Sequence, residues 1–530
     1  MTNDRRLSSA HAPSRSIPAV GIETLTLGVL LAWLLPAFIV MILPPAGTLA
    51  VSPDSISYLA VARDIASGKG PSLPTFALFG PATQALTTWP PLFPLLLASG
   101  LPPIALQALL LGGLSAVVFL TFATSLRVPA LASVLLAWAC ALSMPLLVDA
   151  TYVWSEVLAL LMVALALWSL AGIDDANAGW RWAGGVVCLA LAAYARYAML
   201  LLVPALMLAL LSAPLSRIAR RIRLALLTPV AMTAMFLPLL LHNLLRSHHL
   251  TGAARGASGR GLAANLGDAL LTTTSSFAVS RPAQALFVLA VLAALAVALL
   301  AVLDRLRRQR RADSADAPQA VAWVARLAWT LALVYLAGMV VLRTLVHFDR
   351  LDTRLMSPAV YLLGTGICAA LVGLARSPRH RPWERAALAL PLAMLLVLSL
   401  HRAATQGDRA WHAWRAWGSP EWPINSLLVY TNIRRLQAPA VHGVVLCNRP
   451  LLVQFLTGWD VRAIPPGPWS EAELRRIGSA AQALLLGDRR SNRLAADLRQ
   501  LWPQATTRPM IGAHMLQWSG PPRAARLAAP

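Results

Sequence analysis

Asp54 is the residue whose type and setting best suit chemistry. It lies in the segment 52–68 (SPDSISYLAVARDIASG), just after the first long apolar run. Ser52 is a favourable helix N-cap, Pro53 suits the first turn, and Asp54 follows near the positive end of the helix. Tyr58 lies one turn later, so it shares a face with Asp54 and could position it or stack on a ligand. A carboxylate can accept a proton from a hydroxyl group. The alternative is that Asp54 only complements the helix dipole.

Glu156 is a second carboxylate in an unusual setting, because it stands at the start of an apolar run. Ionisable groups at such positions are costly, face the protein interior and tend to be functional. We interpret Glu156 as a sugar contact or a metal ligand. The alternative is an acid at a helix N-terminus near the membrane surface. Asp149 precedes it by two helical turns and could share the site.

Two arginines stand where apolar runs begin. Arg196 separates two short runs, and Arg354 opens another. A guanidinium group suits phosphate, because its planar N–H donors form paired hydrogen bonds. We interpret both arginines as phosphate-binding residues, with His347 and Asp349 lining the same site. The alternatives are anchoring to lipid headgroups or an ion pair, such as one from Arg354 to Asp349 or Asp352.

The composition indicates a polytopic membrane protein. The chain has 530 residues, of which 58% are hydrophobic and only 13% are charged, and its mean hydropathy is +0.63. A soluble protein of this length would need far more surface charge. The net charge of +23 does not indicate nucleic-acid binding, because most basic residues lie in short loops between apolar runs. The 4 cysteines form no disulfide or metal-binding pattern.

Apolar runs alternate with short loops as far as residue 403. The first run is long enough to span a bilayer, so we expect an uncleaved anchor after a cytoplasmic tail of residues 1–20. The short runs on either side of Arg196 are either a helix pair that meets at the membrane face or one longer kinked helix. The runs are 21–43, 103–126, 129–148, 152–172, 182–195, 197–212, 224–243, 282–303, 321–342, 355–375 and 386–403.

Three basic segments, 216–223, 304–311 and 375–385, determine the predicted orientation. Placing all three inside, together with the N-terminus, requires about eleven spans and an outside C-terminus. A ten-span arrangement would place some of these segments outside. With eleven spans, Asp54 lies outside, near the membrane surface. The segments expected outside are 44–102, 244–281, 343–354 and everything after 404.

The tail of residues 404–530 predicts a small extracytoplasmic α/β domain, attached to a transmembrane domain of residues 21–403 that includes the outer loop 44–102. Ser470 and Glu473 have the spacing of a helix capping box. Strand-like and helix-like stretches alternate along the tail. The strand-like stretches are 442–448, 483–488 and 513–518, and a helix-like stretch covers 492–502.

In their order along the chain, these segments resemble the GT-C superfamily of membrane glycosyltransferases, and within it the family 39 type, which uses dolichyl- or polyprenyl-phosphate sugars. The resemblance implies a GT-C fold, a polyprenyl-phosphate-sugar donor and Asp54 as the catalytic base. A lipid, a glycan or a protein would supply the acceptor hydroxyl. The segments that carry the resemblance are 54–68 (DSISYLAVARDIASG), 89–97 (WPPLFPLLL), 151–158 (TYVWSEVL), 194–204 (YARYAMLLLVP), 242–243, 348–358 (FDRLDTRLMSP), 448–450 and 457–459.

The chain departs from the family in its first outer loop. Many members carry two adjacent acids there, whereas Ser55 follows Asp54 here. A second acid would have to come from Asp64, Asp149 or Glu156. A divalent metal ion remains open as a cofactor, and Asp54 and Glu156 would be its ligands.

We therefore expect an inverting glycosyltransferase, a multi-pass integral protein of the bacterial inner membrane, that takes a sugar from a polyprenyl-phosphate carrier and acts on the extracytoplasmic face. A transporter or flippase of lipid-linked saccharide is the first alternative, and it predicts charges deep within spans. A non-catalytic membrane scaffold is the second. It would be favoured if Asp54, Glu156 and Arg354 lay more than about 15 Å apart, because reacting groups must meet within about 3–3.5 Å.

Overall fold

The computed structural model describes most of the helical part and much of the tail. Nine apolar runs predicted to be helical lie in these residues, and each forms helix; the runs 282–303 and 386–403 lie outside them, so the predicted total of eleven spans stays a prediction. The described residues are 21–43, 49, 52–79, 83–250, 252, 256–276, 317–375, 443–448, 450, 453–454, 459–486, 489–510 and 513–519.

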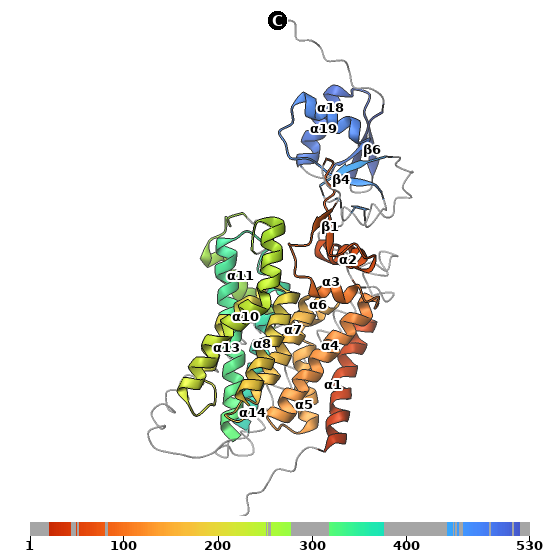
Figure 1. The fold of residues 1–530 in the computed structure, drawn as a ribbon. Coiled ribbons are helices and arrows are strands. Elements are labelled where there is room, and N and C mark those ends of the chain that lie inside the picture. The colour runs from red at the N-terminus through yellow and green to blue at the C-terminus, as the bar shows by residue number, and fades with distance from the viewer. Residues whose placement is uncertain are drawn as a thin grey trace, which may run out of the picture.

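A bundle of apolar helices forms the larger part of the molecule (Figure 1). Within the described ranges, 5 helices are long and apolar enough to cross a membrane, or 6 if the bent pair α5–α6 is one span. α5 and α6 meet at 68°. The bundle helices are α1 (Ile22–Ile42), α4 (Pro103–Leu120), α5 (Ala130–Ala141), α6 (Met144–Ala150), α7 (Glu156–Ala171), α8 (Ala178–Ala195), α9 (Leu202–Leu211), α10 (Ile218–Ser247), α13 (Ala317–Leu345) and α14 (Thr353–Ala375), with the π-helical η2 (Thr121–Ser125) and the 3-10 helical η3 (Tyr197–Leu201).

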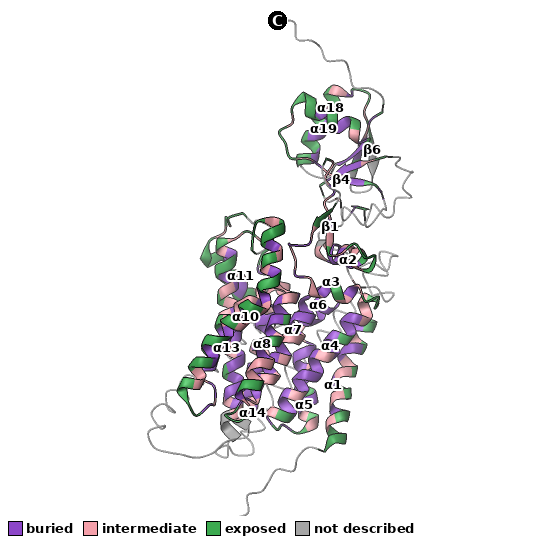
Figure 2. Cartoon of the chain, in the orientation of Figure 1, coloured by how far each residue is buried: buried purple, intermediate pink, exposed green. Residues whose placement is uncertain are grey.

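The centre of the bundle is closely packed, while its outer helices expose apolar side chains (Figure 2). The most apolar stretch of α4 and η2 is 78% buried, against 28% for α1. Small residues allow the helices to approach closely: a side chain at Gly28 of α1 would lie 2.2 Å from the Phe119 ring of α4. Small residues at helix contacts and apolar side chains facing outwards are the pattern of helices that pack within a bilayer.

α8 and α9 are a helix pair, as the first of the two sequence alternatives predicts. α8 ends at Ala195, and Arg196 has an extended backbone with φ of −157° before η3 begins at Tyr197. At the far ends of the pair, the Ser216 N–H donates to Asp175 Oδ2 at 3.0 Å. Both helices therefore run between the same two ends of the bundle, and Arg196 lies at their turn.

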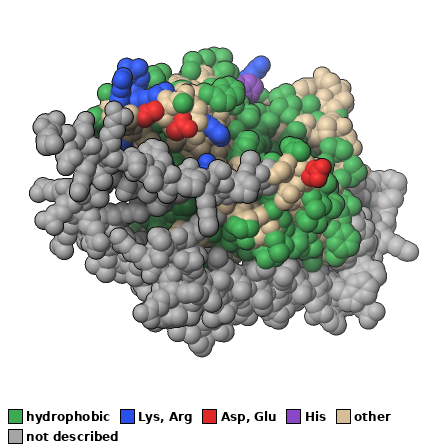
Figure 3. All heavy atoms as spheres, turned by 90° about the horizontal axis from the view of Figure 1, so that it is seen from below, with side chains coloured by type: hydrophobic (Ala, Val, Ile, Leu, Met, Phe, Trp, Pro, Cys, Tyr) green, Lys and Arg blue, Asp and Glu red, His purple; other side chains and the backbone are tan. Residues whose placement is uncertain are grey.

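Several elements outside the bundle lie at one of its ends (Figure 1). They belong to the segments predicted to share one side of the membrane. The opposite end contains exposed basic side chains, including Arg217 and Arg223, and Figure 3 shows basic side chains there beside acidic groups. Which end is outside stays a prediction. The elements are α2 (Pro53–Ala66), β1 (Ser72–Pro74), β2 (Thr83–Ala85), α3 (Leu92–Leu97) and α11 (Leu262–Ser275).

The tail contains a five-stranded sheet, in the order β4-β3-β5-β7-β6, that packs against two helices; we call residues 443–519 the C-terminal unit. β3 is parallel to β4 and β5, whereas β7 is antiparallel to β5 and β6. Ser470 and Glu473 form the predicted capping box. The elements are β3 (Val445–Cys447), β4 (Val461–Ala463), α18 (Glu471–Ala480), β5 (Ala483–Leu486), α19 (Arg489–Leu501), β6 (Thr506–Met510) and β7 (Ala513–Gln517).

Candidate functional site

The first turn of α2 presents Asp54 at the end of the bundle. Ser52 is the N-cap, and its hydroxyl accepts the Ser55 N–H at 3.2 Å. Pro53 occupies the first turn, as predicted. The Asp54 side chain is 26% exposed, so its carboxylate is fixed by the helix yet reachable from outside.

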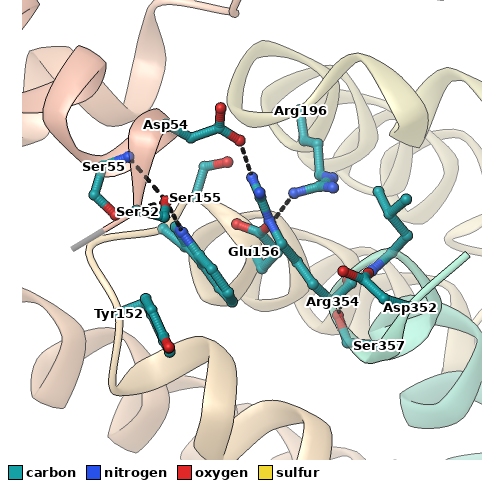
Figure 4. A network of polar contacts seen from close by, with 12 residues as sticks. Ser52, Asp54, Ser55, Tyr152, Ser155, Glu156, Arg196, Asp352, Arg354 and Ser357 are labelled. Carbon is teal, nitrogen blue, oxygen red and sulfur yellow. Dashed lines mark hydrogen bonds and ion pairs between the residues drawn. The ribbon is translucent and has the colours of Figure 1, made fainter. Parts of the chain in front are cut away.

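Arg354 joins the two predicted acids (Figure 4). It lies in the first turn of α14, where its Nη2 is 2.6 Å from Asp54 Oδ2. Its Nε donates to Glu156 Oε1. Residues far apart in the sequence, on α2, α7 and α14, thus meet at one guanidinium group. The separation beyond about 15 Å that would have favoured a scaffold is not present.

Arg196 completes this cluster from the turn between α8 and η3. Its Nη1 donates to the same Oε1 atom of Glu156 (Figure 4). The Glu156 side chain is fully buried, and the side chains of Arg196 and Arg354 are 12% and 15% exposed. Two guanidinium groups therefore share one buried carboxylate, and both arginine side chains remain partly exposed.

Trp154 supports the cluster, and the sequence analysis did not single it out as a site residue. The Arg354 guanidinium carbon lies 4.5 Å from the centroid of the Trp154 ring, a cation–π distance. The indole Nε1 donates to Ser52 Oγ at 2.7 Å, and the ring stacks on Tyr152 with centroids 4.1 Å apart. Trp154 thus joins the N-cap of α2 to Arg354. The available signal was the pair Tyr152 and Trp154, which lie four and two residues before Glu156.

Tyr58 is enclosed by its neighbours, which speaks against stacking on a ligand, and its predicted role in positioning Asp54 stays a prediction. The residue is 2% exposed, and its ring packs edge-on against Trp89 and Phe93. Its hydroxyl group lies 3.3 Å from Ser155 Oγ. Burial raises the pKa of the phenol, and the nearby charges of Glu156 and Asp54 raise it further. A neutral, enclosed ring attaches α2 to the bundle and has no free face for a sugar.

The candidates for a second acid differ in position. Glu156 reaches Asp54 through Arg354, as described above. Asp149 on α6 is fully buried, and both of its carboxylate oxygens lack a hydrogen-bond partner within the described ranges. Asp64 lies near the other end of α2, where it accepts a hydrogen bond from Ser72 Oγ at 2.5 Å. Glu156 is therefore the acid that the structure brings to Asp54.

His347 and Asp349 lie in the exposed turn before α14. The His347 N–H donates to Gly256 O at 2.8 Å, which attaches the Gly-rich segment to this turn. Neither side chain forms a hydrogen bond or ion pair with the cluster among the described residues, so their role in the site stays a prediction. Arg354 forms its ion pairs with Asp54 and Glu156 rather than with Asp349 or Asp352.

Asp352 caps α14 and so helps to place Arg354. Its Oδ1 accepts the Leu355 N–H at 3.0 Å. Burial raises the pKa of this carboxyl group, although that hydrogen bond acts in the opposite direction. Asp352 is therefore a structural acid beside the site.

The donor set around Asp54 does not resemble a metal centre. A cationic guanidinium lies between Asp54 and Glu156, where a shared metal ion would have to sit. Within the described ranges, no group of three His, Cys, Asp or Glu side chains could hold a metal ion. We therefore assign no metal ligands here.

Neither a protein-family model nor a curated protein matches the sequence. Among solved structures, the chain is similar to ArnT from Cupriavidus metallidurans bound to undecaprenyl phosphate, with a TM-score of 0.52 and 13% identity over 96% of this chain and 100% of that chain. This chain has the GT-C fold. Such low identity supports the GT-C fold alone, without a substrate.

Two further structures match more weakly. One is the apo state of the same ArnT, with a TM-score of 0.47 and 11% identity over 96% of this chain and 98% of that chain. The other is the archaeal oligosaccharyltransferase AglB from Archaeoglobus fulgidus, in complex with an inhibitory peptide and a dolichol-phosphate, with a TM-score of 0.45 and 11% identity over 96% of this chain and 74% of that chain.

Proposed function

We propose that this chain is a membrane glycosyltransferase that moves a sugar from a polyprenyl-phosphate-linked donor to an acceptor hydroxyl group. The observation that carries the proposal is the Arg354 guanidinium, which holds the partly exposed Asp54 and the buried Glu156 together. The GT-C fold supports it, as does the undecaprenyl phosphate bound in the similar ArnT structure.

Asp54 is the base in this proposal. It removes the proton from the acceptor hydroxyl as that oxygen forms a bond to the anomeric carbon of the sugar. The bond from the anomeric carbon to the phosphate oxygen breaks, and its electron pair leaves with the polyprenyl phosphate. Phosphate is a good leaving group, so no strong general acid is required. A single displacement of this kind inverts the anomeric configuration.

Arg354 binds the phosphate in this proposal, with Arg196 beside it. A guanidinium group has five N–H donors, so its two carboxylate contacts leave donors for phosphate oxygens. Glu156 fixes both arginines through one oxygen atom, which keeps two positive charges next to the leaving group. Positive charge fixed in advance stabilises the negative charge that develops on the phosphate.

The proposed site faces the extracytoplasmic side of the bacterial inner membrane. The end of the bundle with Arg217 and Arg223 lies opposite α2, and the positive-inside rule supports a cytoplasmic location for that end. The N-terminal tail 1–20 is then inside, and the domain of residues 404–530 is outside. Membrane lipids surround the transmembrane domain 21–403. The acceptor is a lipid, a glycan or a protein.

The test is transfer of a radiolabelled sugar from a polyprenyl-phosphate donor in membranes that contain the protein. Asp54→Asn removes the base but keeps the shape of the side chain, and we expect its turnover to fall by about 10²–10⁴-fold. The matched control is Asp175→Asn at the opposite end of the bundle, which should transfer at the wild-type rate. If Asp54→Asn transfers as fast as the wild type, Asp54 is not the base.

A further inference from the structure

The segment between β1 and β2 packs into the C-terminal unit; we call residues 75–79 the hairpin tip. The Phe76 carbonyl accepts the Ala463 N–H at 2.6 Å, at the edge strand β4. Leu78 packs against the hydrophobic core of the unit. The guanidinium carbon of Arg476, on α18, lies 3.9 Å from the centroid of the Phe79 ring. Backbone, apolar and cation–π contacts therefore fix the hairpin tip to the C-terminal unit.

The base of the same hairpin is fixed to α2. Leu73 and Leu86 form a buried cluster with Val61 of α2. Ser72 Oγ donates to Asp64 Oδ2 at 2.5 Å, which adds a polar contact at the C-terminal end of the helix. The hairpin thus connects the C-terminal unit to the helix that carries Asp54, as the positions of β1, β4 and α2 show (Figure 1).

α2 depends on such contacts for its position. A helix of 14 residues is marginal on its own in water, so its packing decides where it lies. Tyr58 holds α2 to the bundle from one side through its hydroxyl contact with Ser155 at the start of α7, and the hairpin holds α2 from the other.

We infer that the C-terminal unit positions α2, and with it Asp54, through the hairpin, and that Phe79 and Arg476 are positioning residues for the reaction. This inference rests on the proposed function insofar as Asp54 is the base. The mechanical part, that contacts in the C-terminal unit fix α2, can be measured without any substrate.

Hydrogen–deuterium exchange of the full-length protein in detergent tests the inference, with peptides covering residues 53–66 as the readout. Phe79→Ala and Arg476→Ala should each speed exchange in α2 by roughly two- to fivefold, the factor that corresponds to an exposed cation–π contact. Arg476→Lys keeps a cation over the ring and should stay close to wild type.

The matched control is Arg499→Ala, which removes an arginine that bonds Thr507 within the same unit at 2.6 Å. It should leave exchange in α2 unchanged. Unchanged α2 exchange in both Phe79→Ala and Arg476→Ala would overturn the inference, and so would an equal effect of Arg499→Ala.

The transfer assay separates this inference from the proposed function. If the wild-type protein transfers sugar, Phe79→Ala should lower kcat several-fold, and Phe79→Tyr should restore it. If the wild-type protein transfers no sugar from any polyprenyl-phosphate donor, the proposed function fails. The exchange result then still decides whether the C-terminal unit fixes α2.

Discussion

Replacing Glu156 by glutamine should strongly destabilise the protein, because one buried carboxylate balances two guanidinium groups. Arg196 would lose its carboxylate partner among the described residues, whereas Arg354 would keep Asp54. Breaking a buried ion pair from one side costs about 3–5 kcal/mol. The side chain of Arg196 is 12% exposed and can regain some hydration, so we expect a loss of about 3 kcal/mol in the free energy of unfolding.

Unfolding of the purified protein in detergent measures this loss, with Asp149→Asn as the matched control. Asp149 is equally buried, but its oxygens have no hydrogen-bond partner among the described residues, so its neutralisation should be neutral or mildly stabilising. In the double variant Glu156→Gln with Arg196→Gln, the second substitution should cost less than it does alone, because the pair is already broken. Equal unfolding midpoints for Glu156→Gln and Asp149→Asn would refute this explanation of the cluster.

Three further predictions concern the surroundings of the site. Arg354→Lys should reduce transfer by about tenfold or more, measured as kcat/KM for the lipid donor, because a single ammonium group cannot pair with two carboxylates in the fork geometry of arginine. Gly252→Ala should lower the unfolding temperature, because φ is +88° there and a Cβ would lie 1.9 Å from the Thr87 carbonyl oxygen; Gly259→Ala, with open space around it, should not. Asp352→Asn should be tolerated at neutral pH. Burial raises the pKa of Asp352, so the cost of its ionised carboxylate in the folded state grows as the pH rises through that raised pKa, and asparagine avoids this cost. Asp352→Ala should instead lose about 1 kcal/mol of capping in the same unfolding assay.

The sequence predicted those parts of the site that depend on local rules. Ser52 and Pro53 begin α2 because side-chain capping and the fixed φ of proline act within one turn. The chain breaks at Arg196, where a charged residue interrupts an apolar run. The nine described apolar runs are helical, as their length and apolar composition predicted.

Other parts of the site depend on tertiary packing. The sequence offered Asp64, Asp149 and Glu156 as candidates for a second acid and favoured Glu156 as a site residue. The contact of Glu156 with Asp54 through Arg354 depends on how α2, α7 and α14 pack, which no local pattern shows. The role of Trp154 was missed because its partners come from two distant segments.

The strands predicted for the C-terminal unit did not include β6 (Thr506–Met510). Its sequence, TTRPM, lacks the apolar pattern of a strand and includes a proline. It forms an edge strand paired only with β7, and an edge is where a sheet tolerates proline. Docking of the hairpin tip onto β4 was likewise invisible, because loop residues carry no periodic pattern that identifies a distant partner.

The role of Arg354 in phosphate binding can be tested with an experimental structure of the protein in lipid nanodiscs with added undecaprenyl phosphate. We expect a phosphate oxygen within hydrogen-bond distance of the Arg354 guanidinium, at about 2.7–2.9 Å, with the Asp54 carboxylate facing the phosphate side of the site. A lipid phosphate bound away from Arg354 and Arg196, with both arginines still paired only to carboxylates, would contradict it.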